Sequence, residues 1–211
     1  MPNRFALHAM LGSGPSYKAA LMLSLVGEPR DYVHVNLRAG EQKTPDYLAK
    51  NRYGQVPVLE DRELGLFICQ SSVILEHVAE RTGKMLGAST AERLRSREWM
   101  FWEADRLMKG IFRPRSVNRG FMKLSEDTTA HYKAEGAAGL ELVNAHLAGR
   151  DFLVGSAPTF ADVDLYGVIF FAGEAGHDLT ALTHLHAWKA RIESLPGYGL
   201  PGEVQDAPPA A

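Results

Sequence analysis

The pattern of apolar residues changes at Gly83, and this change limits the fold more than any other feature of the sequence. Before Gly83, short apolar runs of strand length alternate with segments of helical character. After it, only helical patterns are convincing. The chain of 211 residues is therefore expected to hold an α/β domain over residues 1–83, a linker at 84–88 and an all-helical domain over 89–200. Residues 201–211 are rich in Pro and Ala, which predicts a mobile tail.

The first domain is expected to follow the order β-α-β-α-β-β-α. Gly27 and Gly83 are typical helix ends, and Thr44 before Pro45 is a typical helix start. The charged segment 61–63 separates two apolar runs, which predicts a hairpin. Strands are expected at residues 4–10, 31–37, 56–60 and 64–69, and helices at 16–27, 44–49 and 71–81.

The second domain is expected to contain helices only. In its first helix, Met100, Leu107 and Ile111 form one apolar stripe, while charged residues such as Arg97 and Asp105 lie elsewhere. This arrangement is typical of an amphipathic helix. Helices are expected at residues 89–112, 128–147, 160–175 and 182–195.

The cysteine and histidine residues give no sign of a metal site. Cys69 is the single cysteine, which excludes a disulfide framework, a cysteine-rich zinc site and a Cys-x-x-Cys redox pair. It lies in an apolar strand, so we expect a buried, inert thiol. His184 and His186 are two residues apart, on different faces of a helix. We therefore expect no metal.

Charge and hydropathy limit the partners. The formal net charge of -2 argues against a broad surface for polyanions, so we expect no nucleic-acid partner. Polar residues interrupt each apolar run before it reaches membrane-spanning length. No signal peptide and no nucleotide-binding glycine motif is apparent. We therefore expect a cytoplasmic protein with no membrane partner.

Three motifs occur in an order and spacing typical of one family. Residues 12–16 read Gly-Ser-Gly-Pro-Ser, residues 54–57 read Gly-Gln-Val-Pro and precede Gln-Ser at 70–71, and residues 159–162 read Thr-Phe-Ala-Asp. Together with the βαβαββα unit and the helices after it, they resemble the cytosolic glutathione transferase superfamily. The resemblance covers the chain from Arg4 to about Gly197. It implies a thioredoxin-like first domain with glutathione as co-substrate.

The first motif resembles the serine-bearing loop of the theta, delta and related bacterial classes. A free thiol has a pKa near ~8.5, and only its thiolate is a good nucleophile. The resemblance implies that the Ser13 hydroxyl stabilises the glutathione thiolate, with Ser16 as the alternative. Either serine could instead simply cap the helix that follows.

The resemblance also implies which residues hold the rest of glutathione. Ser71, at a helix start, would bind the γ-glutamyl carboxylate with Gln70 nearby, although an ordinary cap would look the same. Val56, before a cis proline, would present its backbone to the cysteinyl part; a trans proline is the alternative. The glycyl carboxylate would contact Gln55 and Gln42 or Lys43. The full set is Gln42, Lys43, Gln55, Val56, Pro57, Gln70 and Ser71.

A hydrophobic acceptor site is expected between the first loop and the long helices of the second domain. The alternative for each apolar candidate is a place in the helix-packing core. The candidates are Leu11, Met108, Ile111, Phe112, Arg115 and Phe121. By contrast, Thr159 and Asp162 resemble a capping box and are expected to be structural.

The expected function is a glutathione transferase that activates the glutathione thiol for attack on a small hydrophobic electrophile. One alternative is a glutathione-dependent reductase or isomerase, although Ser13 in place of a cysteine disfavours a mixed disulfide. The other is a non-catalytic binding module with the same fold. The resemblance further implies a homodimer.

Overall fold

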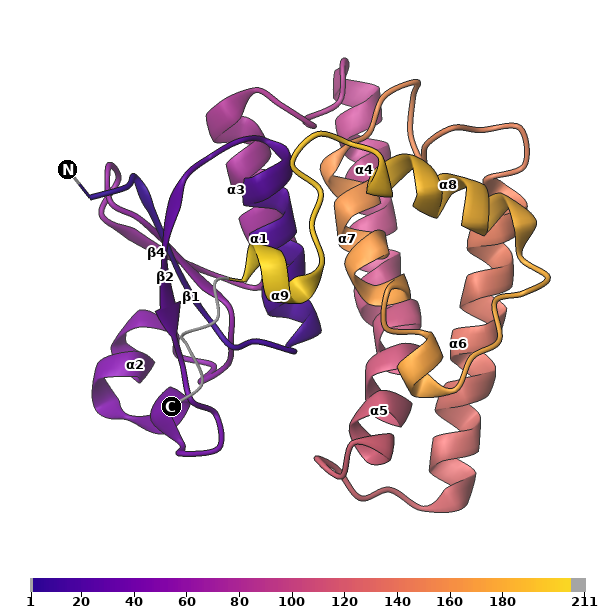
Figure 1. The fold of residues 1–211 in the computed structure, drawn as a ribbon, viewed down its shortest axis with the longest axis horizontal. Coiled ribbons are helices and arrows are strands. Elements are labelled where there is room, and N and C mark those ends of the chain that lie inside the picture. Colours follow the sequence, from indigo (N-terminus) through magenta and orange to yellow (C-terminus); the bar gives the residue numbers. More distant parts are fainter. Residues whose placement is uncertain (1, 206–211) are drawn as a thin grey trace. The chain divides into compact units, whose positions relative to one another are not determined.

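A mixed sheet covered by helices forms the first of two units in the computed structural model, which describes residues 2–205 (Figure 1). The described residues up to Lys84, together with those from Leu195 onward, form this first unit. Residues 85–194 form the second unit. The helical domain was expected to extend to residue 200, whereas in the structure residues 195–200 belong to the first unit.

The sheet has the strand order β2-β1-β3-β4. β1 and β2 are parallel, as expected for strands joined through a helix, and β3 runs antiparallel to both β1 and β4. Its strands are β1 (Phe5–Ala9), β2 (Arg30–His34), β3 (Val58–Asp61) and β4 (Leu66–Cys69). The helices of this unit are α1 (Gly14–Leu25), η1 (Glu41–Lys43), α2 (Pro45–Lys50), α3 (Ser71–Thr82) and α9 (Pro201–Val204). The predicted βαβαββα order is confirmed.

The core of the first unit surrounds β1, whose five residues are all buried. α1 and α3 pack side by side against the sheet, and α1 is apolar on most of its circumference because it is buried. A smaller cluster contains Val35, Tyr47 and Val58, with Cys69 packed against it. Cys69 is half-buried rather than fully buried, and burial raises the pKa of its thiol.

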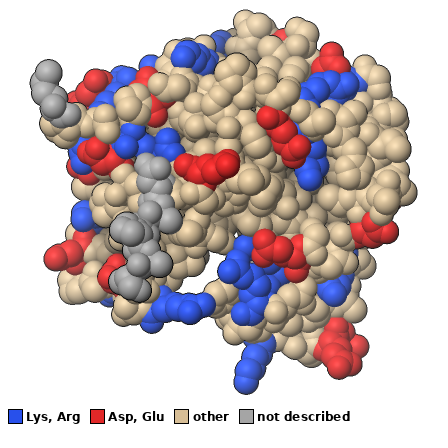
Figure 2. Space-filling view, viewed as in Figure 1, with Lys and Arg blue, Asp and Glu red and all other residues tan. Residues whose placement is uncertain are grey.

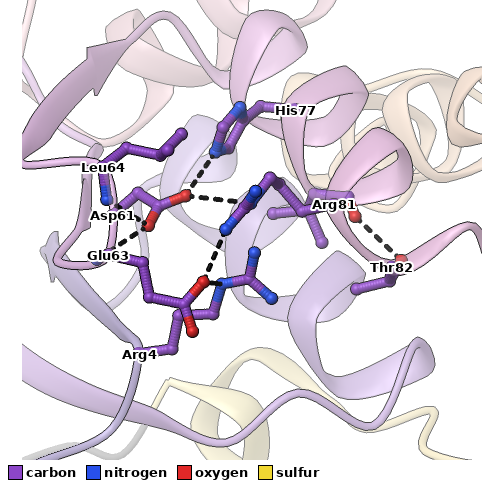
Figure 3. Close-up of polar contacts among 8 residues, drawn as sticks. Arg4, Asp61, Glu63, Leu64, His77, Arg81 and Thr82 are labelled. Carbon is purple, nitrogen blue, oxygen red and sulfur yellow. Dashed lines mark hydrogen bonds and ion pairs between the residues drawn. The ribbon is translucent and has the colours of Figure 1, made fainter.

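A buried carboxylate joins the β3–β4 hairpin to α3 (Figure 3). The Asp61 side chain is fully buried and accepts from His77 Nε2 at 2.9 Å, while Arg81 Nε lies 3.3 Å away. Its other oxygen accepts from the backbone N–H groups of Glu63 and Leu64. Burial disfavours the charged form, but these donors and the Arg81 charge outweigh it and hold the Asp61 pKa below its ordinary value. From the sequence, Asp61 was expected only to belong to the charged turn of the hairpin.

The regular elements of the second unit, among its described residues, are all helices. The predicted helix at 89–112 instead continues to Asn118, through a π-helical segment at Glu103–Leu107. The helices predicted at 128–147 and 182–195 lie within two residues of their expected bounds. The helix predicted at 160–175 instead ends at Ile169, and a separate 3-10 helix follows at Gly173–Ala175. The elements are α4 (Thr90–Trp102), η2 (Glu103–Leu107), α5 (Met108–Asn118), α6 (Glu126–His146), α7 (Phe160–Ile169), η3 (Gly173–Ala175) and α8 (Thr183–Glu193).

α5 continues past Pro114 because another residue replaces the donor that proline lacks. In a helix, the N–H of residue 114 would donate to the carbonyl of residue 110. Gly110 O instead accepts from His177 Nε2 at 3.1 Å. Gly110 also faces Gly136 of α6 so closely that a Cβ atom there would lie 2.4 Å from Gly136 Cα. The two helices therefore meet through glycine backbones.

The capping box predicted at Thr159 and Asp162 is present at the start of α7. Asp162 accepts from Thr159 N at 2.8 Å and also from Leu153 N and Trp188 Nε1, each at 2.9 Å. The Thr159 hydroxyl donates to Asp162 and accepts from Ser96 of α4. This one carboxylate therefore organises α7, the preceding loop and α8, and through Thr159 it reaches α4.

Part of the segment that was expected to be a mobile tail instead packs against the first unit. Residues 201–204 form α9, which packs on α1, and Gln205 is fully buried. Residues 206–211 of the expected tail lie outside the described residues. Within residues 2–205, no helix combines the length and apolar character needed to cross a membrane. On the face in Figure 2, basic side chains mostly lie beside acidic ones.

We predict that Asp61→Asn lowers the free energy of unfolding by about 1.5–3 kcal/mol near pH 7, because its donors lose a charged acceptor. A carboxyl group with a lowered folded-state pKa stabilises the protein above the unfolded pKa of about 3.9 and loses that effect as pH falls through the folded pKa. The difference between wild type and variant should therefore shrink below about pH 4. Urea unfolding at several pH values measures it.

The matched control is Glu63→Gln, because Glu63 also pairs with Arg81 but is mostly exposed. Its loss should stay within about 1 kcal/mol. Equal losses in the two variants would contradict a special role for the buried carboxylate.

Candidate functional site

The register of the sheet brings the predicted first-unit residues to one end. Val58 starts β3 and pairs with His8 near the end of β1 and with Cys69 at the end of β4. Ala9 pairs with His34, so β2 ends there as well. The segments that follow or precede these residues must therefore leave the sheet at the same end. They are residues 10–13, 35–43, 54–57 and 70–71.

A tight turn carries Ser13 from β1 into α1. Ser13 N donates to Met10 O at 3.2 Å, and Gly12 has φ +82°, which favours glycine at the third position of such a turn. Ser13 is the N-cap of α1, and its Oγ accepts from Ser16 N at 3.3 Å. A hydroxyl that accepts in this way keeps its proton for donation to another group.

Ser16 occupies a different environment from Ser13. Its side chain is fully buried, and its Oγ accepts from Met10 N at 3.4 Å. Ser13 is half-buried. Both serines therefore stabilise the turn, and Ser13 is the one with surface open to a ligand.

The loop before β3 is held by residues that the sequence analysis did not single out. The Val56–Pro57 peptide bond is cis. Tyr47 Oη and Asn51 Nδ2 both donate to Gln55 O, at 2.8 and 2.7 Å. Burial raises the pKa of Tyr47, so its hydroxyl stays protonated as a donor. Asn51, placed just before the turn at 52–54, was the available sequence signal.

η1 lies against this loop. Gly54 has φ +58°, and a Cβ atom there would lie 2.9 Å from both Gln42 O and Lys43 Nζ. Lys43 Nζ donates to Gly54 O at 3.4 Å, and Gln42 Nε2 donates to Leu37 O. The structure thus brings Gln42 and Lys43 beside Gly54 and Gln55.

The connection from β4 to α3 has an unusual backbone. Gln70 has φ +71° and ψ 117°, a region that residues with side chains rarely adopt. Such strain is concentrated at functional sites and costs on the order of 1–3 kcal/mol. Ser71 follows as the first residue of α3 and is almost fully buried. The N–H groups in the first turn of a helix favour an anion.

The second-unit candidates separate into two groups. Met108 and Phe112 of α5 are half-buried, and Phe121 is 54% exposed. Ile111 is fully buried, so it belongs to the helix core and is withdrawn from the expected acceptor site. Arg115 is excluded from the acceptor site as well, because its guanidinium group already contacts other side chains of the second unit.

Arg115 is held by two neighbouring side chains of the second unit. Its Nε donates to Glu174 at 2.9 Å, and its guanidinium carbon lies 4.0 Å from the centre of the Phe171 ring. Only 8% of the residue is exposed. Leu11, the remaining candidate, is 39% exposed in the first unit. Among residues 2–205, no three His, Cys, Asp or Glu side chains are grouped to hold a metal ion.

Comparison with known proteins gives the family. The model described as glutathione S-transferase, N-terminal domain, matches residues 5–80, and that for the C-terminal domain matches residues 122–196. A maleylacetoacetate isomerase from Rhizobium meliloti (strain 1021) is 30% identical over 94% of this chain and 95% of its own.

Two solved structures agree with these matches. A glutathione S-transferase from Xanthobacter autotrophicus Py2 has a TM-score of 0.86 at 34% identity, covering 96% of this chain and 98% of its own. One from Pseudomonas fluorescens Pf-5 has a TM-score of 0.87 at 28% identity, covering 94% and 98%. With the thioredoxin-like sheet, the cis-proline loop and the helical second unit in place, the chain belongs to the glutathione S-transferase family.

Proposed function

We propose that this chain is a glutathione transferase in which Ser13 stabilises the thiolate of bound glutathione. The observation that carries the proposal is the contrast between the two serines of the first loop. Ser13 is half-buried at the start of α1 with a hydroxyl proton to donate, whereas Ser16 is fully buried against Met10. Ser13 also lies at the sheet end that holds Pro57 and Ser71.

A hydrogen bond of this kind is strong enough to change the ionisation of the thiol. A bond to a charged group contributes roughly 1.5–3 kcal/mol, which lowers the thiol pKa by about one to two units. The positive end of α1 acts in the same direction. From a starting value near ~8.5, a lowering of about two units makes the thiolate the major form at neutral pH.

The other loops of the sheet end would hold the rest of the tripeptide. The first turn of α3 with Ser71 and Gln70 suits the γ-glutamyl carboxylate. The Val56 backbone, set by the cis bond to Pro57, suits the cysteinyl amide groups. The glycyl carboxylate would contact the set Gln42, Lys43 and Gln55.

The electrophile would contact partly accessible apolar side chains. Leu11 follows β1, and Met108, Phe112 and Phe121 belong to the second unit, each at least partly accessible. An apolar site with few polar groups suits a small hydrophobic electrophile. Ser13 in place of a cysteine argues against a mixed-disulfide route.

A glutathione-dependent isomerase is a second candidate, because a relative at 30% identity is named maleylacetoacetate isomerase. In such a reaction the same thiolate would add to a double bond and leave after rotation, so glutathione would be regenerated. A transferase consumes glutathione in step with the acceptor. Measuring glutathione during turnover therefore distinguishes the two, and failure to bind glutathione would leave only the non-catalytic alternative.

We also propose a cytoplasmic homodimer. Apolar side chains that monomers usually bury are exposed in both units, namely Leu66, Phe67, Val73, Leu94 and Phe101. In the expected dimer the first unit of one copy would pack against the second unit of its partner, so both sets would be covered.

We predict that light scattering at micromolar concentration gives twice the chain mass of 23.2 kDa. Phe101→Glu, at a side chain that is 76% exposed, should shift the protein toward the single-chain mass because the charge would be buried in the interface. Leu142→Glu, at another exposed position of the second unit, is the control and should leave the mass unchanged. A wild type with only the single-chain mass would contradict the dimer.

We predict that Ser71→Ala weakens glutathione binding more than it slows the chemical step. Loss of a partner to a carboxylate corresponds to about 1–3 kcal/mol, or about a 5- to 150-fold rise in Kd. Titration calorimetry measures Kd, and Ser72→Ala is the control at the next residue. Unchanged affinity in Ser71→Ala would remove Ser71 from the site.

We predict that Ser13→Ala raises the pKa of bound glutathione and lowers turnover at neutral pH. Turnover should recover in part as pH rises, because solution chemistry then supplies the thiolate. Ser16→Ala should act through stability instead, by about 1 kcal/mol. Ultraviolet titration of the bound thiolate and pH–rate profiles measure both variants. A shift in Ser16→Ala alone would show that the wrong serine was chosen.

A further inference from the structure

The C-terminal segment, residues 195–205, is bound along the first unit at several points. Gly197 O accepts from Ser24 Oγ at 2.6 Å, and Gly199 O accepts from Tyr17 Oη at 3.0 Å. Arg30 donates to Val204 O. Gly197 has φ +83°, and a Cβ atom there would lie 2.3 Å from Ser24 O, so only glycine fits this contact.

The last described residue of this segment reaches the loop that carries Ser13. Gln205 is fully buried, and its Nε2 donates to Met10 O at 3.3 Å. Met10 O is also the acceptor for Ser13 N, the bond that closes the turn. Two donors, one from the turn and one from the C-terminal segment, therefore share the same carbonyl oxygen.

A glutamine side chain is unusual at a buried position whose only role would be packing. Its Oε1 is buried and has no hydrogen-bond partner among residues 2–205. A buried amide oxygen without a partner is unfavourable, and an apolar side chain of similar size would avoid that penalty. The contact with Met10 O is what the amide provides and an apolar side chain could not.

We propose that Gln205 is a positioning residue for Ser13, an inference that rests on the proposed function. By holding the Met10 carbonyl, it restricts rotation of the Met10–Leu11 peptide plane. That plane sets the direction of the turn and hence the direction of the Ser13 hydroxyl. The C-terminal segment thus contributes to thiolate stabilisation without touching glutathione.

The test compares Gln205→Leu with Val204→Ala in the full chain. Both change buried side chains of the same segment, but only the first removes the donor to Met10 O. Hydrogen exchange of the Ser13 amide without glutathione reports the turn directly. We expect Gln205→Leu to speed it by about 2- to 12-fold, the range for one hydrogen bond, without lowering the melting temperature. Val204→Ala should lower the melting temperature and leave the Ser13 amide unchanged.

The functional measurement is the pKa of bound glutathione together with kcat and KM. Gln205→Leu should raise that pKa and lower kcat, with KM for glutathione nearly unchanged. Unchanged exchange at Ser13, equal acceleration in both variants, or faster exchange with an unchanged thiolate pKa would each overturn the inference. A wild type that forms no bound thiolate would overturn the proposed function instead, and the exchange result alone would then decide whether Gln205 orders the turn.

Discussion

The antiparallel placement of β3 between β1 and β4 is the constraint on which the candidate site depends. Because β3 starts where both neighbours end, the loops at Met10–Ser13, Val56–Pro57 and Gln70–Ser71 meet although they are far apart in sequence. A slip of one residue would turn Asp61 away from His77 and Arg81 and reverse every side chain of the strand. The hydrogen bond from His77 and the ion pair with Arg81 therefore protect the register that assembles the site.

In each unit a buried aspartate connects several segments. Asp61 joins a hairpin to α3, and Asp162 joins α7, α8 and the loop at Leu153. The pKa values of the two carboxyl groups shift in opposite directions. Burial raises the pKa of Asp162 more than its donors lower it, whereas at Asp61 the hydrogen bonds from His77 and Leu64 and the Arg81 charge outweigh burial. Rigid supports of this kind allow the loops between them to hold ligands in a fixed geometry.

Local sequence patterns were enough to predict the order of the elements and the capping box, because each depends mainly on residues close in sequence. They left open whether Ser13 or Ser16 caps α1. The missed features depend on residues distant in the chain. The burial of Arg115 depends on Glu174, the shape of the loop at Gln55 depends in part on Tyr47, and the C-terminal segment depends on α1. The positive φ of Gln70 has no local signal, because a glutamine gives no reason to expect it.

The hydrogen bond to the Gly110 carbonyl links Pro114 and His177, which are far apart in sequence. Pro114 leaves the Gly110 carbonyl without its helical donor, and His177 supplies one from a different segment. A chain that replaced Pro114 with an ordinary residue would restore the helical donor and make the histidine redundant. Among relatives of this chain, proline at the first position and a donor at the second should therefore be gained and lost together. The uninterrupted helix around Pro114 would then be inherited as a pair of residues rather than as a single proline.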